Sequence, residues 1–107
     1  MNIQKIGVIG AGTMGSGIAQ VAAQNGFEVV LQDMNEELAR GGFARIKERL
    51  EKEVSEGKLE SKEKEKILSN IKPSENLEDC KDANLIIEAV IEKEDIKKQI
   101  FKTLDNM

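Results

Sequence analysis

KIGVIGAGTMGSGIAQVAAQNGFEVVLQD, residues 5–33, is the stretch of this sequence that decides the fold. It opens with an apolar run at residues 6–9, whose length and β-branched side chains are typical of a buried parallel strand. A glycine-rich run at residues 10–15 follows, and the apolar spacing after it is helical. A second apolar run at residues 29–31 leads to Asp33. The stretch therefore predicts a strand–turn–helix–strand unit with an acid at its far end.

The glycines at residues 10–15 each have a physical role in a dinucleotide-binding turn. Gly10 permits the tight turn after the strand, and Gly12, which has no Cβ, lets a pyrophosphate approach the backbone. Gly15 allows the helix to pack closely against the sheet. The helix that begins near Thr13 would present free N–H groups and its positive dipole end to the phosphates. A lone Gly-x-Gly-x-x-Gly run is a weak signal, but the strand before it and the helix after it favour a dinucleotide fold.

The helix after the turn is expected to bury one apolar face. Gly26 should end this helix, because glycine accepts the left-handed conformation that follows many helix ends. The residues expected on the buried face recur at i, i+4, i+7 and i+8, and they are Met14, Ile18, Val21 and Ala22.

Asp33 predicts the choice of cofactor. At the end of the second strand its carboxylate would accept hydrogen bonds from the 2′- and 3′-hydroxyls of the adenosine ribose. A 2′-phosphate at the same place would meet a negative charge, and no Arg or Lys follows before Arg40. The sequence therefore predicts NAD rather than NADP.

Composition and charge argue against several classes of protein. A chain of 107 residues forms one domain at most, and its net charge of −4 argues against nucleic-acid or anionic-membrane partners. The uncharged stretch at residues 6–27 contains six glycines, too many for a membrane span or a signal peptide. Cys80 is the single cysteine and the chain has no His, so neither a metal site nor a catalytic thiol is predicted. A reducing, cytoplasmic compartment fits this composition.

Residues 35–72 predict two charged helices that form a hairpin. Asn35 should cap the first helix, Gly57 should break it, and Ser61 should cap a second helix that ends near Asn70. The charges have two interpretations: a solvated surface with i,i+4 ion pairs, or a basic surface that meets an anionic substrate tail. The apolar stripe of the first helix consists of Ala39, Phe43, Ile46, Leu50 and Val54.

The remaining segments complete an α/β pattern. Residues 71–74 predict a short edge strand, residues 77–83 a polar turn or short helix, and residues 84–90 a fourth, buried strand. A last helix is expected from about residue 94 to the end. The order predicts a Rossmann-type, doubly wound and mostly parallel sheet with right-handed crossovers. Its ligand should lie beyond the carboxyl ends of strands one and four, which makes Glu92 and Lys97 candidate cofactor contacts.

With these segments in place, the chain resembles the N-terminal part of the 3-hydroxyacyl-CoA dehydrogenase family, which includes bacterial 3-hydroxybutyryl-CoA dehydrogenases. The resemblance covers all 107 residues and rests on IGVIGAGTMGSGIAQVAAQNGFEVVLQD, on the charged hairpin and on ANLIIEAVIEKEDIKKQIFKTLD. It implies that residues 1–107 are the incomplete N-terminal portion of an NAD-binding Rossmann domain. The helical hairpin at about 35–72 would be an insertion between the second and third strands.

The resemblance also implies roles for individual residues. The family's helical hairpin helps to hold the CoA moiety, for which Arg49, Lys52 and Lys58 are the candidates here. The implied cofactor-binding residues are the loop positions Gly10, Gly12, Thr13, Met14 and Gly15, the ribose-binding Asp33, the strand-end residues Ala89 and Val90, and the polar pair Glu92 and Lys97.

The activity implied by the resemblance is reversible hydride transfer between C3 of an L-3-hydroxyacyl-CoA and NAD, in fatty acid and butanoate metabolism. The family's catalytic His lies beyond Met107, so the 107-residue chain is expected to bind cofactor without turnover. The resemblance implies a homo-oligomeric parent enzyme with an acyl-CoA substrate. Ending after the fourth strand would leave that strand's outer edge open, which predicts marginal stability or self-association.

Other interpretations of the sequence stay open. A β-hydroxyacid or 6-phosphogluconate-type dehydrogenase shares a similar glycine loop, and a preference for NADP would favour it. A non-catalytic NAD(H)-binding or redox-sensing module would bind NADH without turnover. A structural protein that uses the same fold would fold without binding NADH.

Overall fold

The computed structural model describes residues 3–89 of the chain. The last predicted helix therefore lies outside the described residues, as do the candidates Val90, Glu92 and Lys97. In chain order the described elements are β1 (Lys5–Ile9), α1 (Thr13–Gln24), β2 (Glu28–Gln32), α2 (Glu36–Ser55), α3 (Ser61–Ser69), β3 (Ile71–Ser74), the short 3₁₀ helix η1 (Leu77–Cys80) and β4 (Leu85–Glu88).

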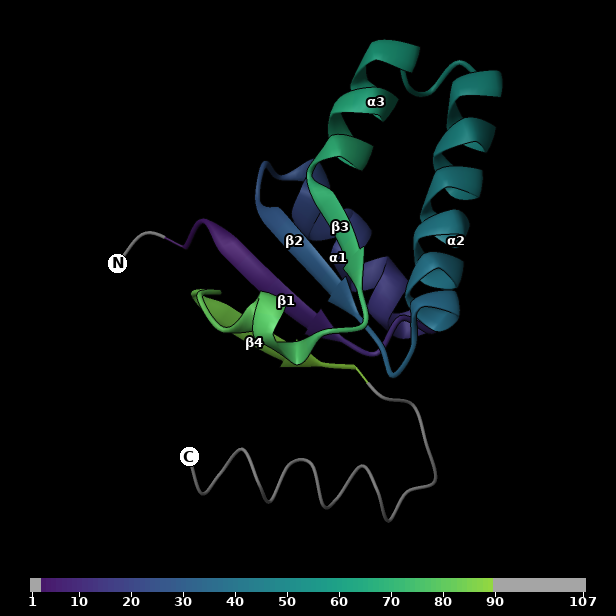
Figure 1. Ribbon diagram of the computed structural model, residues 1–107. Helices are drawn as coiled ribbons and strands as arrows, with labels where there is room; N and C mark the ends of the chain where they lie inside the picture. The colour runs from purple at the N-terminus through teal and green to yellow at the C-terminus, as the bar shows by residue number, and fades with distance from the viewer. Residues whose placement is uncertain (1–2, 90–107) are drawn as a thin grey trace.

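The four strands form one parallel sheet in the order β3-β2-β1-β4 (Figure 1). Ile9 at the end of β1 is in register with Gln32 at the end of β2 and with Glu88 at the end of β4. The carboxyl ends of these three strands therefore meet at one edge of the sheet. The chain moves outward from β1 to β3 and then returns to the other side of β1, so the topological switch point lies between β1 and β4. The predicted doubly wound parallel sheet is confirmed.

Helix α1 buries a different face from the one that its large apolar residues predict. Met14 and Val21 are exposed, at 39% and 59% of their surface, and Ile18 is half-buried. Of the predicted face only Ala22 is buried. The prediction was wrong because small side chains let the helix axis approach its neighbours closely, and the face that does so consists of Gly15, Ser16, Ala19, Ala22 and Ala23.

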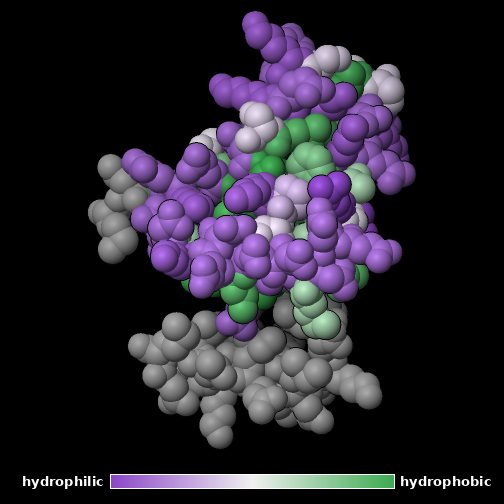
Figure 2. Space-filling view, viewed as in Figure 1, coloured by the Kyte–Doolittle hydropathy of each residue, from purple (hydrophilic) through white to green (hydrophobic). Residues whose placement is uncertain are grey.

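The charged segment between β2 and β3 folds as a helical hairpin, as predicted. Figure 1 shows α2 and α3 side by side, with the turn that joins them far from the sheet. Asn35 caps α2, because its side chain accepts a hydrogen bond from the backbone N–H of Leu38 at 2.8 Å. The cap of α3 differs from the prediction: Glu60 is the N-cap, without a side-chain hydrogen bond, and Ser61 is the first helical residue. Hydrophilic residues cover the hairpin and much of the face in Figure 2.

The core lies between the sheet and the helices α1 and α2. In α2 the predicted stripe is largely confirmed, since Ala39, Ile46 and Leu50 are buried while Phe43 and Val54 are partly so. Ile46, Leu50 and Phe43 pack with buried residues of β1 and β2, namely Val8, Val29 and Leu31.

The segment from β3 to β4 keeps the predicted order of elements. β3 lies at an edge of the described sheet, where Pro73 is tolerated because its missing N–H has no further strand to reach. β4 is shorter than the predicted strand, since it ends at Glu88, and the prediction that it is buried was wrong, because Leu85 and Ile86 are exposed at this edge of the described sheet. Between them, the side chain of Cys80 is buried against Gly7 of β1.

Candidate functional site

A crevice opens at the edge of the sheet where the strands end. Its volume is about 590 Å³, and it lies between the turn from β1 to α1, the end of β2, the start of α2 and the end of β4. The residues that line it are Ile9, Gly10, Gly12, Thr13, Gln32, Asp33, Met34, Leu38, Arg45 and Ala89. The fold therefore brings five of the predicted cofactor-binding residues to one cavity: Gly10, Gly12, Thr13, Asp33 and Ala89.

The turn from β1 to α1 depends on glycine at two positions, Gly10 and Gly15. Gly10 has φ of 102°, a conformation that side chains with a Cβ rarely adopt, and its N–H donates to the carbonyl of Gln32 at 2.7 Å. A Cβ on Gly15 would overlap the carbonyl oxygen of Gly10, which explains the close packing of α1 against the turn. A Cβ on Gly12 would meet nothing within 4 Å, so the space above this residue is open.

The amino end of α1 presents free hydrogen-bond donors. Gly12 is the N-cap and makes no side-chain cap, and the first turn contains no acidic residue. The first helical hydrogen bond runs from the N–H of Ser16 to the carbonyl of Gly12 at 2.9 Å. The N–H groups of Thr13, Met14 and Gly15 precede this bond and have no partner within the helix. Free N–H groups and the positive end of the helix dipole together favour a bound anion.

Asp33 is held at the crevice by two backbone groups. Its Oδ2 accepts a hydrogen bond from the N–H of Ala11 at 2.8 Å, and its Oδ1 accepts one from the N–H of Met34 at 2.7 Å. The residue is half-buried and lines the cavity. Each carboxylate oxygen can accept more than one hydrogen bond, so the group keeps capacity for the hydroxyls of a ligand.

Helix α2 contributes two residues to the site that sequence reasoning missed. A Cβ on Gly42 would come within 2.5 Å of the carbonyl oxygen of Ala11, so α2 crosses the turn at this glycine. Arg45 lies on the same face of α2, and its Nη1 donates to the carbonyl of Ala11 at 3.1 Å. A glycine inside a helical pattern often has a packing reason, so the Gly41–Gly42 pair was the available signal.

The predicted substrate-binding cations occupy different parts of the hairpin. Arg49 faces α1, where its Nε donates to Gln20 Oε1 at 2.9 Å and its Nη2 donates to the buried Ser16 Oγ at 3.0 Å. Lys52 is exposed in the last turn of α2. Lys58 is exposed beyond α2 and lies 3.5 Å from Glu56 in an ion pair. Because α2 spans about 30 Å, Lys58 lies far from the crevice, whereas Arg49 lies beside α1.

The end of β4 joins the site through its backbone. The N–H of Ala89 donates to the carbonyl of Ile9 at 2.7 Å, and Ala89 is buried at the wall of the crevice.

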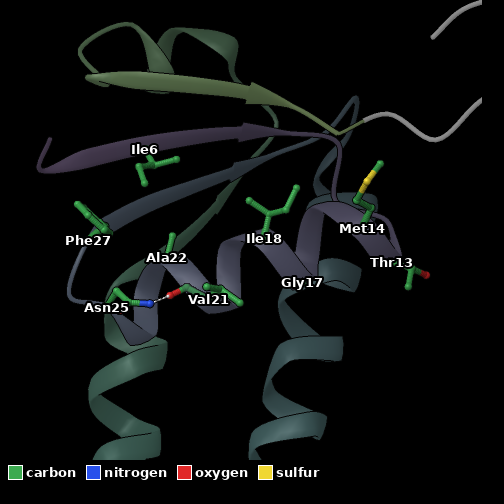
Figure 3. Close-up of a pocket in the computed structure, with 9 residues that line it drawn as sticks. All are labelled: Ile6, Thr13, Met14, Gly17, Ile18, Val21, Ala22, Asn25 and Phe27. Atoms are coloured by element: carbon green, nitrogen blue, oxygen red, sulfur yellow. Dashed lines mark hydrogen bonds between the residues drawn. The ribbon is translucent and has the colours of Figure 1, made fainter.

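A second, apolar hollow lies along α1. Its volume is about 520 Å³. Figure 3 shows the side chains of Ile6, Ile18, Ala22 and Phe27 between the helix and the strands, with Met14 at the helix start. Thr13, in the first turn of α1, lines both hollows.

Other kinds of site find no support in the described part of the chain. Residues 3–89 contain no cluster of three or more His, Cys, Asp or Glu that could hold a metal ion. Among the same residues no helix has the length and apolar character needed to cross a membrane. Burial raises the pKa of the Cys80 thiol, and the nearby Asp79 carboxylate raises it further, which keeps this thiol protonated and unreactive.

Comparison with known proteins places the chain among dehydrogenases. Residues 5–107 match the family model for the 3-hydroxyacyl-CoA dehydrogenase, NAD binding domain. A 3-hydroxybutyryl-CoA dehydrogenase of Bradyrhizobium diazoefficiens is 46% identical over 102 residues, 95% of this chain and 35% of that protein. A probable 3-hydroxybutyryl-CoA dehydrogenase of Bacillus subtilis is 42% identical over 107 residues, 100% of this chain and 37% of that protein.

A solved structure agrees with these relatives. The crystal structure of FadB2 from M. tuberculosis matches with a TM-score of 0.86 and 43% sequence identity, over 99% of this chain and 37% of that one. The chain thus spans little more than a third of the length of the relatives it matches.

Proposed function

We infer that the crevice binds NAD for a 3-hydroxyacyl-CoA dehydrogenase, because this chain belongs to the 3-hydroxyacyl-CoA dehydrogenase family and matches the NAD-binding domain of that family. The reaction that we propose for the whole enzyme is reversible hydride transfer between C3 of an L-3-hydroxyacyl-CoA and C4 of the nicotinamide. Since the chain spans only part of its relatives, residues 1–107 are proposed to be the N-terminal portion of the Rossmann domain.

The observation that carries the proposal is the position of the Asp33 carboxylate beside the amino end of α1. The carboxylate can accept hydrogen bonds from the two ribose hydroxyls, while the N–H groups of Thr13, Met14 and Gly15 face the phosphates. The open space above Gly12 supports a close approach of the diphosphate to the backbone. One dinucleotide can satisfy both ends of this arrangement at once.

The residues of this chain bind and orient the cofactor in this proposal. The bound nicotinamide supplies the hydride chemistry, and the protein supplies its position. The sequence contains no His, so we assign no proton transfer to a His of this chain. Cofactor contacts along the end of β4 are proposed for Ala89, whose backbone lines the crevice, and for Val90, Glu92 and Lys97.

An acyl-CoA substrate is proposed for the whole enzyme. CoA carries phosphates, which basic side chains recognise by charge and hydrogen bonds. On the hairpin, Arg49, Lys52 and Lys58 are the proposed contacts. Lys52 and Lys58 are exposed, whereas the guanidinium of Arg49 already donates to Gln20 and Ser16. A cytoplasmic location, a homo-oligomeric parent enzyme and self-association of this chain through the outer edge of β4 stay predictions.

Titration of the 107-residue chain with NADH and NADPH tests the cofactor proposal. We expect NADH to bind and NADPH to bind at least about tenfold more weakly, because a 2′-phosphate would approach the Asp33 carboxylate. A preference for NADPH would favour the β-hydroxyacid type of dehydrogenase instead.

A second measurement separates the proposal from a non-catalytic NAD(H)-binding module, which the absence of His from the sequence also fits. We expect no turnover of acetoacetyl-CoA with NADH by the 107-residue chain. Restored turnover when the chain is joined to the remaining part of a relative such as the Bacillus subtilis protein would establish the dehydrogenase role. Binding without any restored turnover would favour the sensing role.

A further inference from the structure

Arg45 is fixed at the crevice by Ala11, the residue that also contacts the predicted ribose-binding acid. Its Nη1 donates to the carbonyl oxygen of Ala11, whose N–H donates to Asp33. Arg45 lines the cavity together with Gly12 and Thr13, at the amino end of α1. The guanidinium therefore lies next to the turn over which a dinucleotide's phosphates would pass.

The guanidinium of Arg45 keeps hydrogen-bonding capacity for a ligand. A guanidinium carries five N–H donors, and the bond to Ala11 uses one of them. Within residues 3–89 the ion pairs to carboxylates do not include Arg45. Arg40, on the same helix, differs in this respect, since its Nη2 lies 2.7 Å from Glu36 Oε1. The charge of Arg45 is thus held in place without being neutralised by an ion pair of the described residues.

An anion beside this cation would be electrostatically favourable, because it would also lie at the amino end of α1. The amino end of α1 already carries the positive pole of the helix dipole, and its first turn has no acidic residue. Asp33 supplies one negative charge, but its two oxygens accept the N–H groups of Ala11 and Met34, and within residues 3–89 it forms no ion pair with Arg45. A phosphate bound at the N–H groups of α1 would neutralise both the helix end and the guanidinium.

We propose that Arg45 is a further cofactor-binding residue, whose guanidinium donates to the diphosphate of the dinucleotide while it also holds the Ala11 carbonyl. This inference rests on the proposed NAD-binding function and adds a charged contact to a site otherwise built from backbone groups. The diphosphate is the favoured target rather than a 2′-phosphate, because Asp33 disfavours a further anion at the ribose.

Amide NMR titration of the labelled 107-residue chain tests this role with adenosine, ADP and NADH as probes. Arg45→Met removes the charge and keeps a long unbranched side chain. Arg40→Met makes the same change on the same helix, at an arginine that pairs with Glu36 and does not line the crevice. We expect Arg45→Met to weaken the binding of ADP and of NADH by the same factor, about tenfold, and to leave the affinity for adenosine unchanged. Arg40→Met should leave all three affinities unchanged, and Arg45→Lys should restore part of the loss.

Three outcomes would overturn the inference. If Arg45→Met leaves ADP and NADH affinity as in the wild type, Arg45 does not contact the diphosphate, although the NAD-binding function stands. If adenosine affinity falls by the same factor as ADP affinity, Arg45 only shapes the turn. If the wild-type chain binds neither ADP nor NADH, the inference and the proposed function are both wrong.

Discussion

Gly15 in the first turn of α1 lies so close to Gly10 that a Cβ on Gly15 would overlap the carbonyl oxygen of Gly10. The overlap involves backbone, which cannot move aside as the end of a flexible side chain can. Gly15→Ala should therefore destabilise the chain by about 3 kcal/mol and abolish NADH binding, because α1 must shift away from the turn. Urea denaturation and NADH titration measure the two effects.

Gly17 provides the matched control on the same helix. A Cβ there would meet nothing within 4 Å, so Gly17→Ala should raise the free energy of unfolding by up to about 1 kcal/mol through helix propensity alone. Equal effects of the two substitutions would contradict the close packing of Gly15.

Gly42 and Gly41 form a second matched pair, on α2. A Cβ on Gly42 would lie 2.5 Å from the Ala11 carbonyl oxygen, whereas one on Gly41 would lie in open space. We expect Gly42→Ala to lower the free energy of unfolding by about 1–3 kcal/mol and to weaken NADH binding, since it displaces the turn. Gly41→Ala should instead stabilise the chain by about 1 kcal/mol. If Gly42→Ala is as well tolerated as Gly41→Ala, α2 does not cross the turn as closely as described.

Asp79 contacts Ser74 and Lys72 of β3, and these contacts should make the stability of the chain depend on pH. The hydrogen bond from Ser74, at 2.5 Å, is the largest cause that lowers the pKa of this carboxyl below 3.8, and Lys72 lowers it further. Because the pKa is lower in the folded chain, the unfolded chain binds more protons between the two values, and stability falls as pH falls through this range.

Urea denaturation between pH 6 and roughly pH 3 tests this dependence. Ser74→Ala removes the main cause, so the difference in stability between the wild type and this variant should be greatest above pH 5 and shrink below pH 4. A difference that stays constant across the range would show that Ser74 acts on packing alone.

The structural roles of some residues could be predicted from the sequence, because the backbone conformation at those positions requires a particular residue type. Gly10 needs a positive φ, and Gly15 leaves no room for a Cβ, so both are readable from the glycine spacing. Asn35 was readable as a cap because its side chain competes well for a free N–H at a helix start. The order of strands and helices along the chain also predicted a doubly wound sheet, and the crevice lies, as this predicts, where β1 and β4 end.

The contacts between distant segments were not readable in this way. Arg40, Arg45 and Arg49 look alike in the sequence, yet the first pairs with a carboxylate, the second holds a loop carbonyl and the third contacts α1. The buried face of α1 was mispredicted for a related reason. Hydrophobic spacing selects large residues, whereas close approach between helix and sheet selected small ones such as Ala19 and Ala23.

The most direct test of the account is NADH and NADPH affinity in Asp33→Ala. Loss of a carboxylate that binds two ribose hydroxyls should weaken the binding of NADH by about tenfold or more. The affinity for NADPH should fall less or rise, because its 2′-phosphate no longer meets a negative charge. Glu37→Ala, an exposed acid at the start of α2, should change neither affinity. NADH affinity that is unchanged in Asp33→Ala would contradict the assignment of this crevice as the dinucleotide site.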